Sequence, residues 1–226
     1  MQRCGGALDR IERVALDVER ACLERSIYMI GPEKARFLRE LVTAKKPRLV
    51  VECGTAIGYS GLHFLAAITS LGKGKLVTVE LVPSRAAEAR ENFRRAGVDA
   101  FVEVLAGDAE EVLGNIAGPG GSLETGGAFD FDGTGRPVDF LFLDNDFGNY
   151  SRSFHAIEPR LSDGALVLAD NTGIGAGEMG GYLAYVRSRF RSECRWFDTN
   201  LPWAERDAME ITEYRSRRLS DDDMSA

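Results

Sequence analysis

Short apolar strands alternate with helices through most of this chain. Apolar segments at 48–53, 75–80, 100–105, 138–143 and 165–169 predict strands, and the segments at 59–71, 83–96, 109–116, 150–161 and 177–190 predict the helices that follow them. Such alternation is typical of a parallel sheet with helices on both faces. Strands that are apolar on both sides are typical of buried parallel strands. We therefore predict an α/β fold with a doubly wound, mostly parallel sheet.

The two ends of the chain complete this fold. Amphipathic spacing predicts helices at 8–23 and 31–42, and strands are expected at 194–199 and 208–214, joined by a hairpin at 200–203. These strands bring the sheet to seven, with one antiparallel edge strand. We expect a single domain over 1–226, comprising an amino-terminal helical cap (1–30), a glycine-rich loop (114–136) and a disordered acidic tail (216–226).

Composition excludes several classes of protein. The 226 residues are 44% hydrophobic, enough for one domain with a sizeable core. A net charge of −7 lacks the basic excess of a nucleic-acid binder. The apolar runs are far shorter than the roughly 20 residues of a membrane span, and the amino terminus has no signal-peptide pattern. Four cysteines without a CxxC pair indicate reduced thiols, so we expect a cytoplasmic protein.

Two acidic strand ends follow a glycine turn. The turn occupies 51–60, Asp144 ends the strand at 138–143, and Asp170 and Asn171 end the strand at 165–169. In a parallel α/β sheet, ligands bind at the carboxyl ends of the strands, so these residues are expected to face one crevice. The spacing predicts a nucleotide-like cofactor beside a divalent metal.

The residues of the turn distinguish between cofactors. A dinucleotide fingerprint places glycines at 54, 56 and 59, but Ala56 and Tyr59 occupy the second and third positions. Glu52 would repel a pyrophosphate yet suits the sulfonium and ammonium of S-adenosylmethionine. Glu80 ends the second strand, where a carboxylate can accept both hydroxyls of a ribose. Asp108 either takes an adenine amino group or caps the helix that begins there, and both roles are compatible.

These motifs resemble the class I methyltransferases, specifically the cation-dependent O-methyltransferases that include catechol and caffeoyl-coenzyme A O-methyltransferases. The similarity runs from about 31 to 214, on the segments 51–60, 79–80, 89–92, 107–109, 142–144 and 169–171. The resemblance implies a Rossmann-like fold, S-adenosylmethionine as cofactor, and a divalent cation such as Mg²⁺. The cofactor-binding residues it implies are Glu52, Gly54, Ala56, Gly58, Tyr59, Ser60, Glu80, Gly107, Asp108, Ala109 and Asp144.

The same resemblance implies that Asp144, Asp170 and Asn171 hold the metal. Two carboxylates and an amide form an all-oxygen set suited to a hard octahedral ion, whereas zinc would prefer nitrogen or sulfur ligands. The alternative is that Asp144 binds the cofactor or a loop backbone, while Asp170 and Asn171 form a turn.

The chain departs from the family at the expected general base. The family carries a lysine three residues after the first metal aspartate, and this position is Phe147. Phenylalanine transfers no proton, so either the metal alone acidifies the acceptor, another residue such as Asp146 takes the role, or the reaction is lost. His63 and His155 lie within predicted helices, where packing or surface roles are expected.

Two further segments have open interpretations. The loop 172–181 could close over an acceptor or be a solvent-filled linker. Phe147, Tyr182 and Trp203 could form an aromatic wall for a planar acceptor or belong to the core.

We therefore expect an O-methyltransferase that acts on a small, catechol-like acceptor held by a divalent metal. The amphipathic segment 8–23 favours a homodimer. The alternatives are a catalytically weak S-adenosylmethionine-binding protein, and an N-methyl or aminopropyl transferase on the same scaffold.

Overall fold

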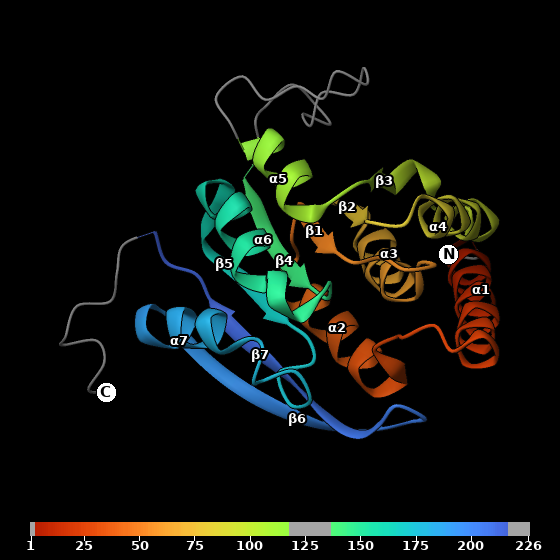
Figure 1. Ribbon diagram of the computed structural model, residues 1–226. Coiled ribbons are helices and arrows are strands. Elements are labelled where there is room, and N and C mark those ends of the chain that lie inside the picture. The colour runs from red at the N-terminus through yellow and green to blue at the C-terminus, as the bar shows by residue number, and fades with distance from the viewer. Residues whose placement is uncertain (1–2, 118–136, 217–226) are drawn as a thin grey trace.

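Seven strands form one sheet at the centre of the molecule, with helices on both faces (Figure 1). The structure is a computed structural model and describes residues 3–117 and 137–216. The strands are β1 (Leu49–Cys53), β2 (Lys75–Glu80), β3 (Val102–Ala106), β4 (Val138–Leu143), β5 (Leu161–Ala169), β6 (Arg191–Leu201) and β7 (Ala204–Glu213). The helices are α1 (Arg3–Arg25), α2 (Gly31–Lys45), α3 (Tyr59–Leu71), α4 (Pro83–Ala96), α5 (Ala109–Ala117), α6 (Tyr150–Ile157) and α7 (Gly180–Arg189).

The strand order is β3-β2-β1-β4-β5-β7-β6. Strands β1 to β5 pair in parallel, whereas β7 is antiparallel to both of its neighbours, β5 and β6. This confirms the predicted seven-stranded, doubly wound, mostly parallel sheet with its antiparallel pairing at one edge, where the antiparallel strand β7 lies beside the terminal strand β6. The chain winds outward in one direction from β1 and in the other from β4, so the topological switch point lies between these two strands.

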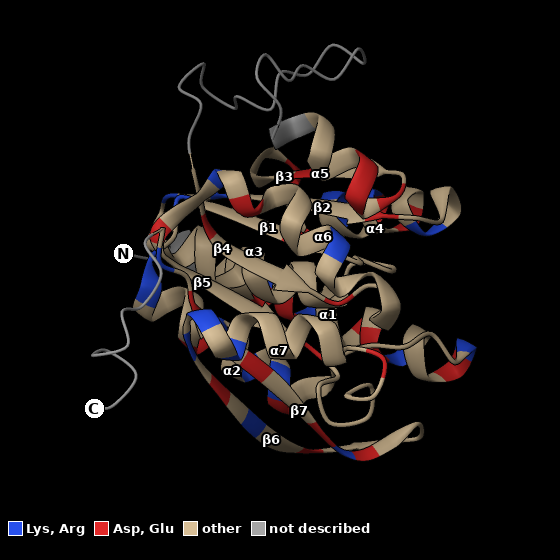
Figure 2. Ribbon diagram, turned by 60° about the vertical axis from the view of Figure 1, so that its left-hand side comes forward, with Lys and Arg blue, Asp and Glu red and all other residues tan. Residues whose placement is uncertain are grey.

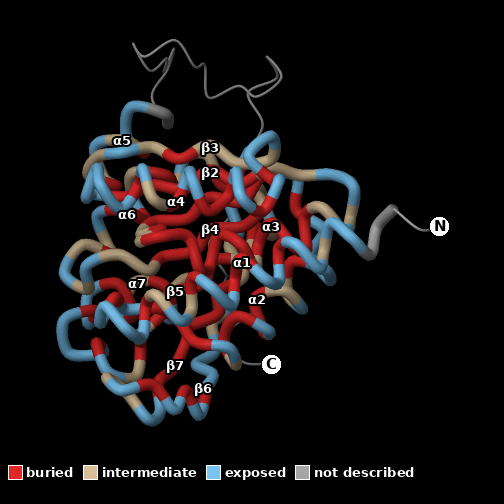
Figure 3. Tube along the Cα trace, turned by 90° about the vertical axis from the view of Figure 1, so that its right-hand side faces the viewer, coloured by how far each residue is buried: buried red, intermediate tan, exposed pale blue. Residues whose placement is uncertain are grey.

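Two hydrophobic cores cover the two faces of the sheet, and buried positions follow the central strands (Figure 3). Successive side chains of a strand point to opposite faces. Val50 of β1 and Phe140 of β4 therefore pack against α1 to α4, whereas Val51 and Leu141 pack against α5 to α7. This burial on both faces explains why the strands are apolar at nearly every position.

Several element boundaries differ from those predicted. Helix α6 ends at Ile157 rather than at 161 and continues as a 3-10 turn, Glu158–Arg160, because Pro159 has no N–H for the α-helical ladder. Strands β6 and β7 are longer than predicted, since Leu201 already pairs with Ala204 across a two-residue turn. The first four residues of the predicted loop, 114–117, belong to α5. The remainder of the predicted loop, 118–136, and the tail 217–226 lie outside the described residues.

The charged surface is mixed in sign where the hairpin is exposed. Basic and acidic residues are interspersed along β6 and β7 (Figure 2), and Arg206 pairs with Asp198 across the two strands at 2.9 Å. In the described parts of the chain, no helix is both long enough and apolar enough to cross a membrane.

Candidate functional site

A cavity of about 550 Å³ opens at the carboxyl ends of the central strands. Its walls come from the residues that directly follow β1, β2, β3, β4 and β5, together with Tyr28 and Met29 before α2 and Trp203 of the β6–β7 turn. It lies at the topological switch point, where a ligand is expected in this architecture. Of the predicted site residues, those that line it are Gly54, Ala56, Glu80, Gly107, Asp108, Ala109, Asp144, Asp146, Phe147, Asp170 and Asn171.

The glycine turn is packed directly against the end of β4. Gly54 has φ +92°, and a Cβ atom placed there would lie 2.1 Å from the backbone oxygen of Asp144. Only glycine combines this backbone conformation with such a close approach. The turn is therefore fixed against the first acidic strand end, and position 54 requires glycine for both reasons.

Glu80 and Asp108 are held by backbone N–H groups. The Glu80 carboxylate accepts the N–H of Ala56 at 2.8 Å and of Val82 at 2.9 Å, which fixes both of its oxygens at the end of β2. Asp108 accepts the N–H of Glu110 at 2.9 Å and thereby caps α5. Asp108 also lines the cavity, so the capping role and the proposed adenine contact are compatible in this geometry.

Four residues predicted to contact the cofactor do not line the cavity: Glu52, Gly58, Tyr59 and Ser60. Glu52 is fully buried and accepts hydroxyl hydrogen bonds from Thr55, Ser60 and Thr78. Burial raises its pKa, while these three bonds oppose the increase. Glu52 thus lies behind the turn and fixes its conformation, and its carboxylate has no surface in the cavity that could meet a sulfonium directly.

Asp144, Asp170 and Asn171 meet at the opposite end of the cavity. The N–H groups of Asp144 and Asp170 continue the parallel ladders, to the oxygens of Cys53 and Leu143, each at 2.9 Å. Burial and the neighbouring charge of Asp170 raise the pKa of Asp144 well above its usual range. Burial also raises the pKa of Asp170, although Lys34 opposes this. The second carboxylate oxygen of Asp170, Oδ2, is buried and has no hydrogen-bond partner in the described residues.

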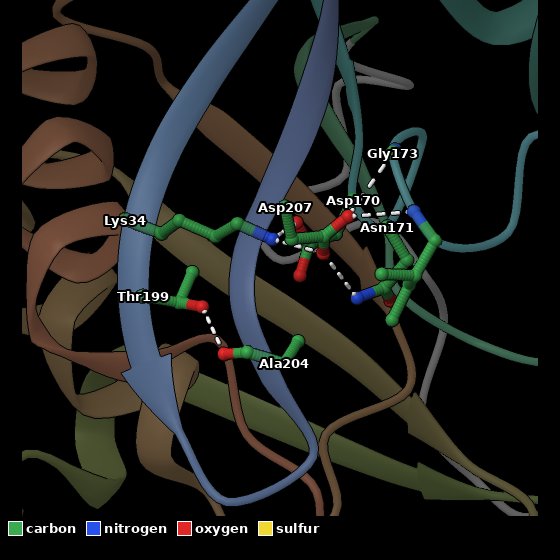
Figure 4. Close-up of polar contacts among 8 residues, drawn as sticks. Lys34, Asp170, Asn171, Gly173, Thr199, Ala204 and Asp207 are labelled. Carbon is green, nitrogen blue, oxygen red and sulfur yellow. Dashed lines mark hydrogen bonds and ion pairs between the residues drawn. The ribbon is translucent and has the colours of Figure 1, made fainter.

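A buried lysine and a third aspartate complete this end of the site (Figure 4). The Nζ atom of Lys34 on α2 donates to Asp170 Oδ1 and, at 2.6 Å, to Asp207 Oδ2 on β7. The side chains of Lys34 and Asp207 are almost fully buried. Burial alone would lower the pKa of Lys34, but the two carboxylates outweigh it and raise that pKa. Burial would likewise raise the pKa of Asp207, but Lys34 and the hydrogen bonds outweigh it and lower that pKa.

The sequence interpretation missed Lys34 and Asp207, although Lys34 left a signal. It precedes Leu38 by four positions and Phe37 by three, which places a charged side chain on the buried stripe of α2. A lysine in that position is expected to have a buried acidic partner. Nothing in the local pattern of β7 distinguished Asp207 from a surface aspartate.

Aromatic and aliphatic side chains form the outer wall of the cavity. Phe147 lies in a 3-10 turn, Phe147–Asn149, and Trp203 contacts Tyr28 edge to face with ring centroids 5.4 Å apart. Tyr28 and Ile174, also on the wall, are exposed. Tyr182 does not belong to this wall, because it is buried among the side chains between α6 and α7. Of the three residues predicted to form an aromatic wall, Phe147 and Trp203 line the cavity.

Proton-accepting groups are few on this wall. Asp146 is exposed beside Phe147, and its Oδ2 accepts a long hydrogen bond of 3.3 Å from Asn149 Nδ2. His63 and His155 do not line the cavity. His63 instead accepts a hydrogen bond from Arg39, and His155 contacts Glu158.

The donor set fits a hard cation on chemical grounds. Lys34 pairs with the carboxylates of Asp170 and Asp207, and Asp144 is close enough for the charge of Asp170 to add to burial in raising its pKa. Within the described residues, no three His, Cys, Asp or Glu side chains form a metal-binding group. A site here therefore depends on Asn171 as the third protein ligand, with the unpartnered Asp170 Oδ2 as one of the two carboxylate ligands.

The proteins to which the chain is similar are named as methyltransferases. Residues 51–172 match the family model described as a methyltransferase domain. The chain is 28% identical over 142 residues to a catechol O-methyltransferase of Niastella koreensis, covering 63% of this chain and 57% of that protein. It is 31% identical over 180 residues to a probable O-methyltransferase of Mycobacterium tuberculosis, covering 78% and 71% respectively.

The fold is shared with solved structures at lower identity. An O-methyltransferase from Bacillus cereus in complex with SAH superposes with a TM-score of 0.70 at 22% identity, and covers 93% of this chain and 91% of that one. The chain thus spans a little over half the length of the Niastella protein and nearly all of the Bacillus chain.

Proposed function

Because the chain belongs to the methyltransferase domain family, we propose that it is an S-adenosylmethionine-dependent O-methyltransferase with a small hydroxylated acceptor and a divalent cation. One observation carries this proposal. A single cavity has Glu80 and Asp108 at one end and Asp144, Asp170 and Asn171 at the other. The first end suits the adenosine of the cofactor, and the second suits a cation beside the acceptor oxygen.

The adenosine end offers polar contacts on a rigid frame. Both oxygens of Glu80 are already fixed by backbone N–H groups and keep lone pairs for the two ribose hydroxyls. Leu81 and Val82 line the same end and are exposed, so they provide an apolar surface for the adenine ring. Gly54 and Ala56 allow the backbone of the turn to approach the methionine part closely.

Asp144, Asp170 and Asn171 would hold the cation through their oxygen atoms. When bound, the cation would lower the pKa of the acceptor hydroxyl. The cation would in turn offset the burial and the repulsion from Asp170 that raise the pKa of Asp144. This arrangement explains why two carboxylates are placed together with one unpartnered oxygen.

The chain itself contributes alignment and exclusion of water. Transfer breaks the sulfur–methyl bond, forms an oxygen–methyl bond, converts the sulfonium to a thioether, and releases the hydroxyl proton. Phe147 replaces the lysine that would take this proton. We propose that the exposed carboxylate of Asp146, beside Phe147, accepts the proton instead, directly or through water. The reaction therefore favours acceptors whose hydroxyl is already acidic, such as phenols.

The outer wall supports a planar acceptor. Phe147 and Trp203 face the cavity with Tyr28 and Ile174, and these side chains offer mostly apolar contact area. A catechol-like ring would lie against them with its oxygens toward Asp144 and Asp170. The predicted homodimer remains part of the proposal, with the exposed Leu16 and Leu23 of α1 as its support. A cytoplasmic location stays a prediction.

The test is methyl transfer from labelled S-adenosylmethionine to a panel of catechols and hydroxycinnamates, with Mg²⁺ and then with excess chelator. We expect product that depends on the cation, and its loss in Asp170→Ala. Asp163→Ala is the matched control, because Asp163 lies on β5, the strand that ends just before Asp170, is exposed and does not line the cavity. Cofactor binding without product across the panel would favour the non-catalytic alternative, and product with chelator present would remove the cation from the proposal.

A further inference from the structure

Four donors converge on the carboxylate of Asp207. Its Oδ2 accepts Lys34 Nζ at 2.6 Å and Asn171 Nδ2 at 2.9 Å, and its Oδ1 accepts the N–H groups of Gly173 at 3.2 Å and Ile174 at 3.0 Å. Figure 4 shows Lys34 reaching this carboxylate from α2, with Asn171 approaching it from the loop after β5. Asp207 therefore connects α2, β7 and the segment that carries two of the proposed cation ligands, although it does not itself line the cavity.

These bonds decide which atoms of Asn171 and Asp170 remain free. An ionised carboxylate only accepts hydrogen bonds, so the amide of Asn171 must turn its NH₂ group toward Asp207. The amide oxygen, Oδ1, is then directed away from Asp207. Lys34 in the same way occupies Oδ1 of Asp170 and leaves Oδ2 without a partner. The network thus engages the NH₂ group of Asn171 and the Oδ1 atom of Asp170. It leaves the Oδ1 atom of Asn171 and the Oδ2 atom of Asp170 for a cation.

We propose that Asp207 and Lys34 are positioning residues that fix the cation-facing oxygens of Asn171 and Asp170. This inference rests on the proposed function, because it assigns a purpose to the oxygens only if a cation binds there. It extends that function to two residues outside the cavity wall. Groups that orient metal ligands from behind typically change metal affinity by about 10- to 100-fold when they are removed.

The effect of the charges of Lys34 and Asp207 on cation binding can be separated from the effect of their hydrogen bonds. Asp207 and Lys34 carry opposite charges, so Lys34→Met combined with Asp207→Asn leaves the net charge of the site unchanged. The double variant removes both charges of the Lys34–Asp207 pair together, whereas a single replacement would leave one of them buried and unpaired. It also takes the ammonium partner from the buried carboxylate of Asp170. If only net charge mattered, the double variant would bind a cation as the unaltered protein does.

The chain offers a matched control on the same strand. Glu210 of β7 is also fully buried and pairs with Arg187 at 2.6 Å. Positions 207 and 210 are three residues apart along the strand, so their side chains point to opposite faces of the sheet. Arg187→Met combined with Glu210→Gln therefore removes another ion pair of β7, one whose arginine is half exposed, without touching Asn171 or Asp170.

The experiment measures Mn²⁺ affinity of the full chain by electron paramagnetic resonance, and S-adenosylmethionine affinity without metal by calorimetry. We expect Lys34→Met/Asp207→Asn to weaken Mn²⁺ binding by about 10- to 100-fold, with cofactor affinity changed by less than about twofold, and the control pair to change neither. Asp207→Asn alone is expected to weaken Mn²⁺ binding at least as much.

Each result has a distinct meaning. Unchanged Mn²⁺ affinity in the double variant, with binding by the unaltered protein, overturns the positioning role and leaves the proposed function intact. Equal losses of Mn²⁺ and cofactor affinity also overturn it, because they indicate general unfolding. Absence of Mn²⁺ binding by the unaltered protein removes the cation from the proposed function, and the positioning role with it. Tighter Mn²⁺ binding in the double variant means that Lys34 itself occupies the cation position, which contradicts the inference.

Discussion

Replacement of Gly54 by alanine tests how closely the glycine turn and β4 are packed. The new Cβ atom would lie 2.1 Å from the backbone oxygen of Asp144, and Cβ contacts below 3.0 Å essentially do not occur. The end of β4 or the turn must therefore move by about 1 Å, and the moving atom is backbone rather than a flexible side chain. Forced overpacking of this kind typically costs about 1–3 kcal/mol, and the left-handed backbone conformation costs an alanine about 1–2 kcal/mol more.

Gly72 supplies the control for backbone strain alone. It has φ +66° at the end of α3, and a Cβ atom there would meet nothing within 4 Å. Gly72→Ala is therefore expected to lower the free energy of unfolding by only about 1–2 kcal/mol. The difference between the two variants, about 1–3 kcal/mol, isolates the steric term.

Equilibrium urea unfolding measures both variants, with stability taken from the midpoint and the slope. Calorimetry of S-adenosylmethionine binding adds a functional readout, because displacement of Asp144 disturbs the end of the cavity that we propose meets the reactive part of the cofactor. We expect weaker cofactor binding in Gly54→Ala and unchanged binding in Gly72→Ala. Equal losses of stability in the two variants would refute the argument that the turn is packed directly against β4.

Three further predictions concern the cofactor, the acceptor and pH. Glu80→Gln should weaken S-adenosylmethionine binding by about tenfold or more, measured by calorimetry, because charge-assisted hydrogen bonds contribute roughly 1.5–3 kcal/mol; undiminished affinity would exclude Glu80 as the ribose ligand. Phe147→Lys should raise the rate of transfer to weakly acidic hydroxyls by about tenfold or more and shift the pH–rate profile, since a positioned base typically contributes at least a hundredfold; an unchanged profile would mean that proton removal does not limit the rate. Burial, together with the charge of Arg39, lowers the pKa of His63 from 6.5 to about 3. Between these two pH values the unfolded chain binds more protons than the folded chain. The free energy of unfolding therefore decreases as the pH falls below about 6.5, by up to about 1.4 kcal/mol per pH unit. In His63→Gln, urea unfolding between pH 6.5 and 4.5 should show a shallower loss than in the unaltered protein, and parallel curves would contradict the assignment.

Local sequence patterns determined most of the architecture. The spacing of apolar residues identifies a strand at 138–143 and an amphipathic helix at 83–96 without reference to the rest of the chain. The structure has both elements at the predicted residues. The position of the cavity also followed, because parallel strands bring Gly54, Glu80 and Asp144 to one edge whatever the details of packing. The capping role of Asp108 was likewise readable, since it depends only on the next few residues.

Tertiary structure alone decided where several side chains point. Glu52 and Tyr182 are residue types that often occur in binding sites. Packing nevertheless places Glu52 behind the glycine turn and Tyr182 in the core. The pairing of Lys34 with Asp170 and Asp207 joins residues separated by 136 and 173 positions. No local period encodes such a contact, because it exists only after α2 has packed beside the sheet and β7 has inserted between β5 and β6.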